Sequence, residues 1–165
     1  MSKLDTRVIL AMEALFRSNE LDSPNQQTQG QPEPISRPIP TLDGRGMPMT
    51  PMLRARFSHC GEWTNAYLGY SFLSLTQIAA RSKSKTTQKR VRERARYWAP
   101  GALAANFAKP CAVTLFGDDP IEMQEIYLIA DPGREEPQVV RYFGQDERVF
   151  SSLLDFLCFA AGNPR

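Results

Sequence analysis

The sequence predicts an α+β fold: a single domain, residues 1–165, with an antiparallel sheet of about four or more strands flanked by N- and C-terminal helices. Three short runs rich in β-branched and aromatic residues, at 111–116, 125–130 and 137–143, follow one another with turn-forming residues between them. Helical patterns of apolar residues stand near both ends of the chain. A length of 165 residues with 42% hydrophobic content is enough for one ordinary core.

The N-terminal part of the chain predicts a helix followed by an irregular segment. In 4–16, apolar residues recur every three or four positions, as an amphipathic helix requires. The composition then changes to Gln, Asn, Ser and Pro, and the prolines remove backbone donors and exclude regular helix. We therefore expect 19–50 to be a proline-rich loop or linker. The alternative for its proline-rich part is a polyproline ligand of a small recognition domain.

The middle of the chain predicts two short helices with an apolar stretch between them. Residues 52–57 fit a short helix, and the aromatic and aliphatic stretch at 67–75 fits a buried connection or a strand. Ser74 stands where it can cap a helix over 74–80, and Gln77, three residues later, completes a capping box.

A basic helix is expected at 86–99. Val91, Ala95 and Trp98 stand at helical spacing and form a narrow apolar stripe, while basic side chains cover most of the remaining circumference. Pro100 should end this helix, because the residue before a proline disfavours helical backbone.

Charge is segregated along the chain. Residues 81–100 carry eight basic and one acidic side chain, whereas 101–165 carry five basic and ten acidic ones. Like charges four residues apart on a helix cost on the order of 0.2–0.5 kcal/mol each. We therefore expect acidic groups to compensate the basic helix. The candidates are a phosphate backbone, an acidic protein surface, or acidic residues of the same chain, namely Asp118, Asp119, Glu122 and Glu125.

The last third predicts strands followed by a capped helix. The runs at 125–130 and 137–143 are expected to pair as a hairpin or small meander. A helical pattern at 150–157 follows, with Ser152 as its cap and Asp155 as the reciprocal partner. Its apolar side is expected to pack on the sheet through Phe150, Leu153, Leu154 and Leu157.

Nothing in the sequence predicts a catalytic or metal centre. His59, the only histidine, lies beside Cys60 without a second ligand cluster at suitable spacing. The cysteines are odd in number and widely spaced, which argues against a disulfide framework. The acidic residues near Asp118 suggest a divalent cation or paired carboxylates, but a solvated turn fits them better because the calcium loop pattern is missing. We therefore expect no enzyme, no metal and no cofactor.

No run of the sequence is long and apolar enough to cross a bilayer, and the first fifteen residues lack a secretory pattern. We therefore expect a cytoplasmic protein that does not contact membranes.

A family pattern covers about half of the chain. It consists of hydrophobic segments in a fixed order, at 72–78, 97–100, 112–116, 126–129, 136–140 and 150–157, the last reading Phe-Ser-Ser-Leu-Leu-Asp-Phe-Leu. This order resembles the SUKH superfamily, whose members include bacterial toxin-immunity proteins and the fungal cell-wall assembly regulator. The long proline-rich stretch and the basic helix depart from the family pattern.

The resemblance implies a single SUKH-like domain that acts as an immunity protein, binding and neutralising a cognate bacterial toxin or secreted effector. Two groups of residues are expected to contact the partner: Lys89, Arg92, Arg96 and Tyr97 on the basic helix, and Asp118, Asp119 and Glu122 in the acidic turn. Two alternatives remain open. One is a nucleic-acid-binding regulator that uses the basic helix at 86–99, and the other is an effector chaperone or adaptor.

Overall fold

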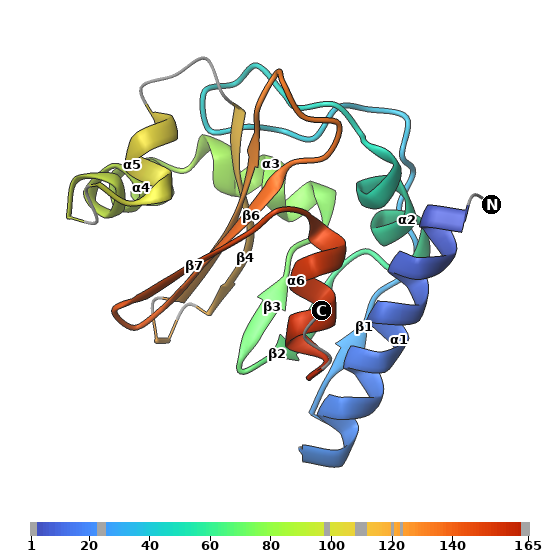
Figure 1. Cartoon of the computed structure of the whole chain (residues 1–165). Helices are drawn as coiled ribbons and strands as arrows, with labels where there is room; N and C mark the ends of the chain where they lie inside the picture. Colours follow the sequence, from blue (N-terminus) through green and yellow to red (C-terminus); the bar gives the residue numbers. More distant parts are fainter. Residues whose placement is uncertain are drawn as a thin grey trace.

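The computed structural model describes residues 3–22, 26–97, 100–107, 112–119, 121–122 and 124–162. A seven-stranded antiparallel sheet, with its strands in chain order, forms the centre of the molecule (Figure 1). The strands are β1 (Thr28–Gln29), β2 (Trp63–Tyr67), β3 (Tyr70–Phe72), β4 (Ala112–Asp119), β5 (Gln124–Ala130), β6 (Gln138–Phe143) and β7 (Asp146–Phe150). The helices of the described residues are α1 (Lys3–Asp22), α2 (Pro51–His59), α3 (Leu75–Lys83), α4 (Lys85–Tyr97), α5 (Ala102–Phe107) and α6 (Leu153–Ala160). The predicted α+β class, with helices at both ends, is confirmed.

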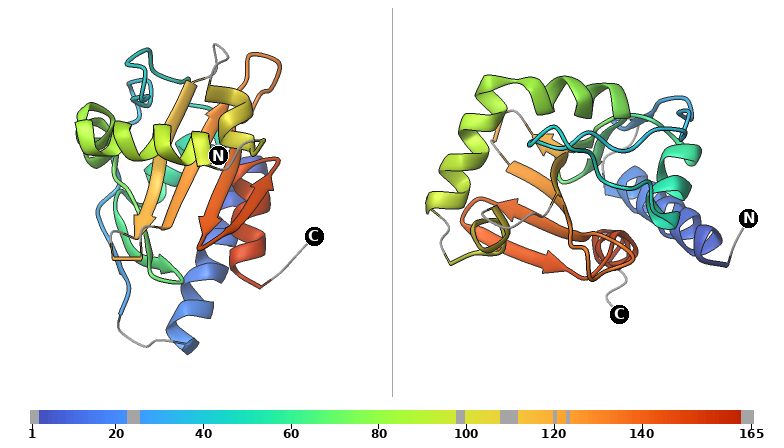
Figure 2. Two further views of the ribbon diagram at one scale, coloured as in Figure 1. Left: turned by 90° about the vertical axis from the view of Figure 1, so that its left-hand side faces the viewer. Right: turned by 90° about the horizontal axis from the view of Figure 1, so that it is seen from above.

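The helices cover both faces of the sheet. Figures 1 and 2 show α1, α2 and α6 on one side, while α4 and α5 lie on the other and α3 leads into α4. The N- and C-terminal helices pack against each other as well as against the strands. This arrangement leaves the outer side of α4 facing away from the body of the molecule.

The predicted hairpin is present. β5 and β6 pair antiparallel with Leu128 opposite Val139, and β4 pairs with β5 along its length, with Leu115 opposite Tyr127. The capped helices are also confirmed: Ser74 and Gln77 form a capping box at the start of α3.

Strand β7 was not predicted. A two-residue turn joins it to β6, and Gly144 takes a positive φ of 57° in this turn. Glycine at the first position of a two-residue hairpin turn is the sequence signal that marks it. Phe150, which the sequence assigned to the last helix, ends β7 instead, so that part of the prediction is wrong.

Aromatic rings fill the core between the sheet and α6. Phe72 lies 5.3 Å from Phe116, 5.6 Å from Trp63 and 5.9 Å from Phe156, measured between ring centroids. Offset and edge contacts of this kind stabilise more than area burial alone predicts. The Ser152 hydroxyl accepts a hydrogen bond from the backbone N–H of Asp155 at 3.2 Å, which confirms the predicted cap of α6.

The proline-rich stretch is packed rather than a free linker. Helix α1 continues to Asp22, so the expectation of irregular chain from residue 19 is wrong at its start. Further along, Ile39 and Met47 are buried and exchange two backbone hydrogen bonds of 2.8 and 2.9 Å. The backbone N–H of Leu42 also donates to the carbonyl of Val113 at 2.9 Å. Apolar residues between the prolines therefore fasten this loop to β4.

Two predicted positions, Trp98 in the basic helix and Cys111 at the start of a strand, lie outside the described residues. Within the described part of the chain, no helix is both long enough and apolar enough to span a bilayer.

Leu157→Ala is expected to lower the free energy of unfolding by about 2–5 kcal/mol, because Leu157 is fully buried and truncation leaves a cavity. Leu21→Ala is the matched control, since it removes the same atoms from a side chain that is 85% exposed on α1. Its free energy of unfolding should stay within about 0.5 kcal/mol of the wild-type value. Urea denaturation of both variants measures the difference. Equal losses would contradict the assignment of α6 to the core.

Candidate binding surface on helix α4

Helix α4 has an inner face that packs on the sheet and an outer face in solvent. Thr87, Val91 and Arg94 are buried on the inner face, which confirms Val91 as a core position. Ala95, also predicted in the apolar stripe, is half-buried. Because an α-helix turns every 3.6 residues, the basic residues between these positions fall on different sides of α4.

The inner arginines of α4 are neutralised by one buried carboxylate. The Nε and Nη2 atoms of Arg94 each lie 2.8 Å from Oε2 of Glu125, and Nη1 of Arg90 lies 3.3 Å from Oε1. Glu125 is on β5 and is only 1% exposed. The Arg94 guanidinium also lies 4.5 Å from the ring centroid of Tyr142, a cation–π distance. The acidic group expected to compensate the basic helix is therefore Glu125 of the same chain.

A second ion pair fastens the end of α3. Nη2 of Arg81 lies 3.2 Å from Oδ2 of Asp118, whose side chain is almost fully buried on β4. Burial raises the pKa of Asp118, while the charges of Arg81 and Arg90 oppose that shift. Desolvation therefore outweighs the attraction of both arginines.

The acidic residues near Asp118 are not a solvated turn, so that interpretation is wrong for three of them. Asp118, Asp119 and Glu125 are all buried. Asp119 closes the turn by accepting backbone hydrogen bonds from Ile121 at 2.9 Å and Glu122 at 3.3 Å. Of the predicted acidic contact residues, only Glu122 is exposed.

Four cations share the outer face of α4. Lys85, Lys89, Arg92 and Arg96 are all exposed and follow one another at steps of four, three and four residues, which places them in one row. We call this row the basic stripe. Lys89 lies 3.8 Å from Glu93 on the same face. The other three cations make no ion pair with any residue that the structure describes.

The structure thus places three of the seven predicted contact residues, Lys89, Arg92 and Arg96, in one row. A fourth, Tyr97, follows Arg96 directly and lies about 100° round the helix from it. Tyr97 is 73% exposed at the end of the helix. Sequence reasoning missed Lys85 because it began the helix one residue later. Its spacing of four from Lys89 was the available signal.

Two potentially reactive side chains lie next to each other in the sequence at the end of α2, His59 and Cys60. The thiol of Cys60 is buried and receives a hydrogen bond from Arg56 at 3.3 Å, and burial raises its pKa while Arg56 opposes the shift. His59, the last residue of α2, is partly exposed. The described residues contain no group of three or more side chains placed to hold a metal ion.

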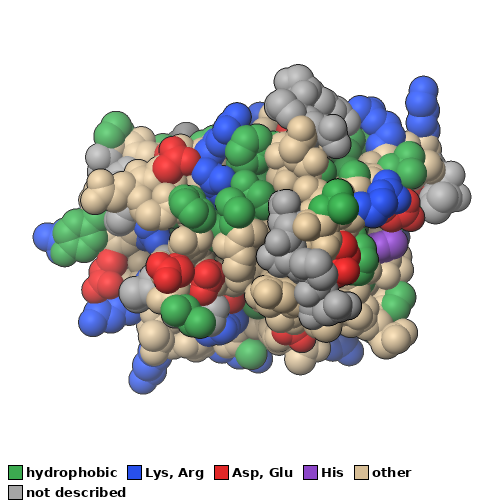
Figure 3. Space-filling view, turned by 90° about the horizontal axis from the view of Figure 1, so that it is seen from below, with side chains coloured by type: hydrophobic (Ala, Val, Ile, Leu, Met, Phe, Trp, Pro, Cys, Tyr) green, Lys and Arg blue, Asp and Glu red, His purple; other side chains and the backbone are tan. Residues whose placement is uncertain are grey.

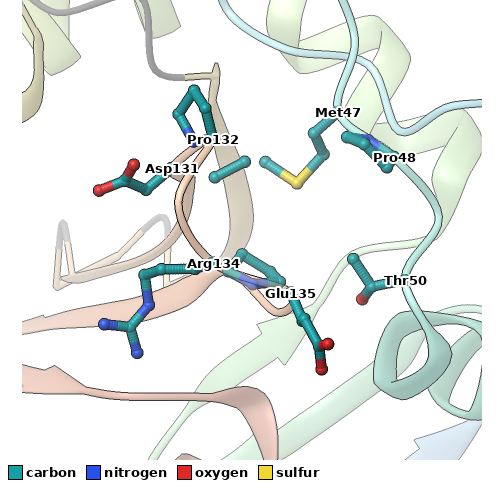
Figure 4. Close-up of a pocket in the computed structure, with 9 residues that line it drawn as sticks. Met47, Pro48, Thr50, Asp131, Pro132, Arg134 and Glu135 are labelled. Carbon is teal, nitrogen blue, oxygen red and sulfur yellow. The ribbon is translucent and has the colours of Figure 1, made fainter.

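A pocket of about 310 Å³ lies between the 47–50 segment and the turn after β5 (Figure 4). Figure 4 shows Met47 and Pro132 facing each other across it, while the charged ends of Asp131 and Arg134 point away. Without convergent polar groups, this pocket offers a ligand little specificity.

The end of the molecule opposite this pocket has a surface of mixed charge. Figure 3 shows acidic, basic and hydrophobic side chains interleaved there, where the turns of the sheet gather in Figure 1. Among the side chains that Figure 3 colours by type, cations and carboxylates lie near one another, in contrast to the row of cations on α4.

Fold and surface together define an α+β protein with a row of four exposed cations along a single helix. No protein-family model matches the chain, and no curated protein matches it either.

Glu125→Gln is expected to lower the free energy of unfolding by roughly 3–5 kcal/mol, because it leaves the charges of Arg90 and Arg94 without their buried partner. Glu93→Gln is the control, since its pair with Lys89 is exposed and should be worth less than about 0.5 kcal/mol. Chemical denaturation of both variants gives the comparison. A loss of the same size in Glu93→Gln would show that burial is not what makes the Glu125 pairs matter.

Asp118→Asn tests whether the raised pKa of the buried Asp118 carboxyl makes stability depend on pH. Because the folded-state pKa of Asp118 is raised above its ordinary 3.8, the folded protein holds this proton more tightly than the unfolded chain does. Ionisation therefore subtracts stability as the pH rises from 3.8 through the raised pKa. The wild type should lose stability relative to Asp118→Asn as the pH rises above 3.8. Urea titrations at a series of pH values measure the free energy of unfolding of both proteins. A value for the wild type that stays constant or rises relative to that of Asp118→Asn would contradict the prediction.

Proposed function

We propose that this protein is a non-enzymatic binding protein of the toxin-immunity kind, which neutralises a cognate bacterial toxin or effector by covering its active surface. The observation that carries the proposal is the outer face of α4, where Lys85, Lys89, Arg92 and Arg96 stand in a row, and Tyr97 is exposed at the end of the helix. The resemblance of the later segments to the SUKH superfamily supports the same function.

The basic stripe is held on a rigid support. Arg90 and Arg94 tie the inner side of α4 to Glu125 on the central strand β5, and Arg81 ties α3 to β4. A contact surface that is ordered before binding avoids the entropy cost of ordering it in the complex. This favours tight recognition by a rigid helix face.

The cations of the basic stripe and the exposed ring of Tyr97 suit contact with an acidic protein. A row of like charges raises the rate at which an oppositely charged partner is captured. Exposed tyrosine and arginine side chains are the types that most often dominate the binding energy of protein interfaces. Tyr97 and Arg96 supply both at the end of α4.

Nucleic acid is the main alternative partner, since the same cations can contact phosphates and Tyr97 can stack on a base. Glu93 favours a protein instead. Its side chain is 52% exposed on the outer face, next to Arg92, and its carboxylate would repel a phosphate backbone. On a protein partner the same carboxylate can pair with a lysine or arginine.

Arg92→Glu/Arg96→Glu tests the proposal in cells that express the product of the neighbouring gene as the candidate toxin. The wild-type protein should restore growth, and the double variant should lose rescue because its reversed charges repel an acidic surface. Arg17→Glu is the matched control, since Arg17 is an exposed arginine on α1, across the sheet from α4, and it should rescue like the wild type. Circular dichroism and melting curves establish that the variants are folded.

Each other outcome contradicts the proposal. Rescue that survives the double reversal would place the contact elsewhere. Binding that stabilises the neighbouring product without restoring growth would indicate a chaperone or adaptor. Strong, salt-steep binding to labelled DNA or RNA at two salt concentrations would indicate the nucleic-acid regulator.

A further inference from the structure

We propose that the binding surface continues beyond α4 into a groove beside the junction of α3 and α4, and that this groove takes an extended acidic segment of the protein partner. The inference rests on the proposed function and specifies what the partner must present. The groove has a volume of about 520 Å³ and lies between the loop 37–46 and the residues that join the two helices. We call it the corner groove.

The loop wall of the corner groove is fixed. Leu42 is bonded through its backbone to β4, and the backbone N–H of Gly46 donates to the Thr41 hydroxyl at 2.7 Å. Gly46 has a φ of 86°, and a Cβ there would lie 3.2 Å from Pro38, so only glycine fits comfortably. Proline at Pro38 and Pro40 further limits the backbone of this wall. The groove is therefore preformed rather than created by a ligand.

The corner groove carries an excess of positive charge. Its lining includes three cations, Arg37, Arg45 and Lys83, against one carboxylate, Asp43. Nη2 of Arg45 lies 2.5 Å from Oδ2 of Asp43, so these two charges satisfy each other. Although partial burial opposes the shift, hydrogen bonds from Thr41 and Arg45 hold the pKa of Asp43 below its ordinary value.

Two cations remain for a ligand. Arg37 and Lys83 are exposed, and neither forms an ion pair with a residue in the described part of the chain. They come from opposite walls of the groove, one from the loop and one from the end of α3. Carboxylates spaced along an extended peptide can reach both walls.

The corner groove adjoins the basic stripe. Gln88 lines the groove, and on α4 it is three residues from Lys85 and four from Arg92, hence their neighbour on the helix surface. The outer face of a 13-residue helix is about 20 Å long and 10 Å wide. Its area of about 200 Å² is a quarter of the roughly 800 Å² that each partner of a stable complex usually buries. A partner seated on α4 must therefore touch surface beyond it.

The groove favours carboxylates on a peptide over a chain of phosphates. Asp43 at the groove and Glu93 on α4 place negative charge within the same surface. Because Arg45 already pairs with Asp43 and Lys89 with Glu93, the evenly spaced phosphates of a nucleic acid would compete with these two carboxylates. A peptide can place a neutral or basic residue opposite each of them.

NMR titration of the full ¹⁵N-labelled chain with the peptide acetyl-(Glu-Ala)₄-amide at low salt tests the groove without the natural partner. We expect saturable shifts of the backbone amides of Gly44, Gly46, Ser82 and Gln88. Arg37→Glu/Lys83→Glu should weaken this binding at least tenfold, and Arg17→Glu should leave it unchanged. The peptide acetyl-(Lys-Ala)₄-amide should cause no shift.

The titration has two results that overturn the inference. Amide shifts confined to α4 would show that the corner groove is not part of the binding surface. Tighter binding of inorganic phosphate or of a twelve-base-pair DNA duplex would assign the groove to phosphate chemistry instead.

Rescue experiments separate this inference from the proposed function. If Arg37→Glu/Lys83→Glu restores growth as well as the wild type while Arg92→Glu/Arg96→Glu does not, the immunity function stands and the groove proposal falls. If no version restores growth but the acidic peptide still fills the groove, the groove stands and the immunity function falls. A partial loss of rescue in Arg37→Glu/Lys83→Glu supports both.

Discussion

The burial of Glu125 beneath α4 is the interaction on which the candidate surface depends. A carboxylate removed from water is costly unless it is paired, and Arg90 and Arg94 pair with both of its oxygens. The same contact satisfies two cations of a helix that would otherwise repel its own charges. Glu125 therefore fixes the position of α4 on the sheet and determines which side of the helix faces solvent.

Fixing the helix divides one basic segment into two sets of residues with different roles. The arginines that face β5 have buried partners and serve the fold, whereas the basic stripe faces water and remains available. The overall excess of positive charge in 81–100 does not by itself distinguish them. Helical phase does, because Val91 must face the core and this sets the direction of every other side chain on α4.

Local signals in the sequence predicted much of the fold. The strand runs are rich in β-branched residues, and Ser74 and Ser152 cap their helices as expected. Long-range contacts were not predictable. Asp118 looked like part of a solvated turn because its partner Arg81 lies 37 residues earlier in the chain, and burial of an acid depends on such a partner. The proline-rich stretch looked like a linker because only the fold reveals where Ile39 is inserted.

The same limits apply to the binding surface. The exposure of Lys89, Arg92, Arg96 and Tyr97 was predictable from the pattern at 86–99, since exposed positions on a helix follow from its period. The corner groove was not predictable because its walls come from two segments more than 35 residues apart. No residue spacing within either segment indicates that the two segments are in contact.

Both edges of the sheet are protected against pairing with a further strand. An exposed strand edge can bind another strand unless charge or length prevents it. At one edge, β1 has only two residues. At the other, β7 carries Asp146, Glu147 and Arg148 in succession, and Glu147 accepts a hydrogen bond from the backbone of Ala102 at 2.9 Å. Charged and partly covered, this edge resists strand addition, which supports the proposal that side chains of α4 and of the loop beside it contact a partner.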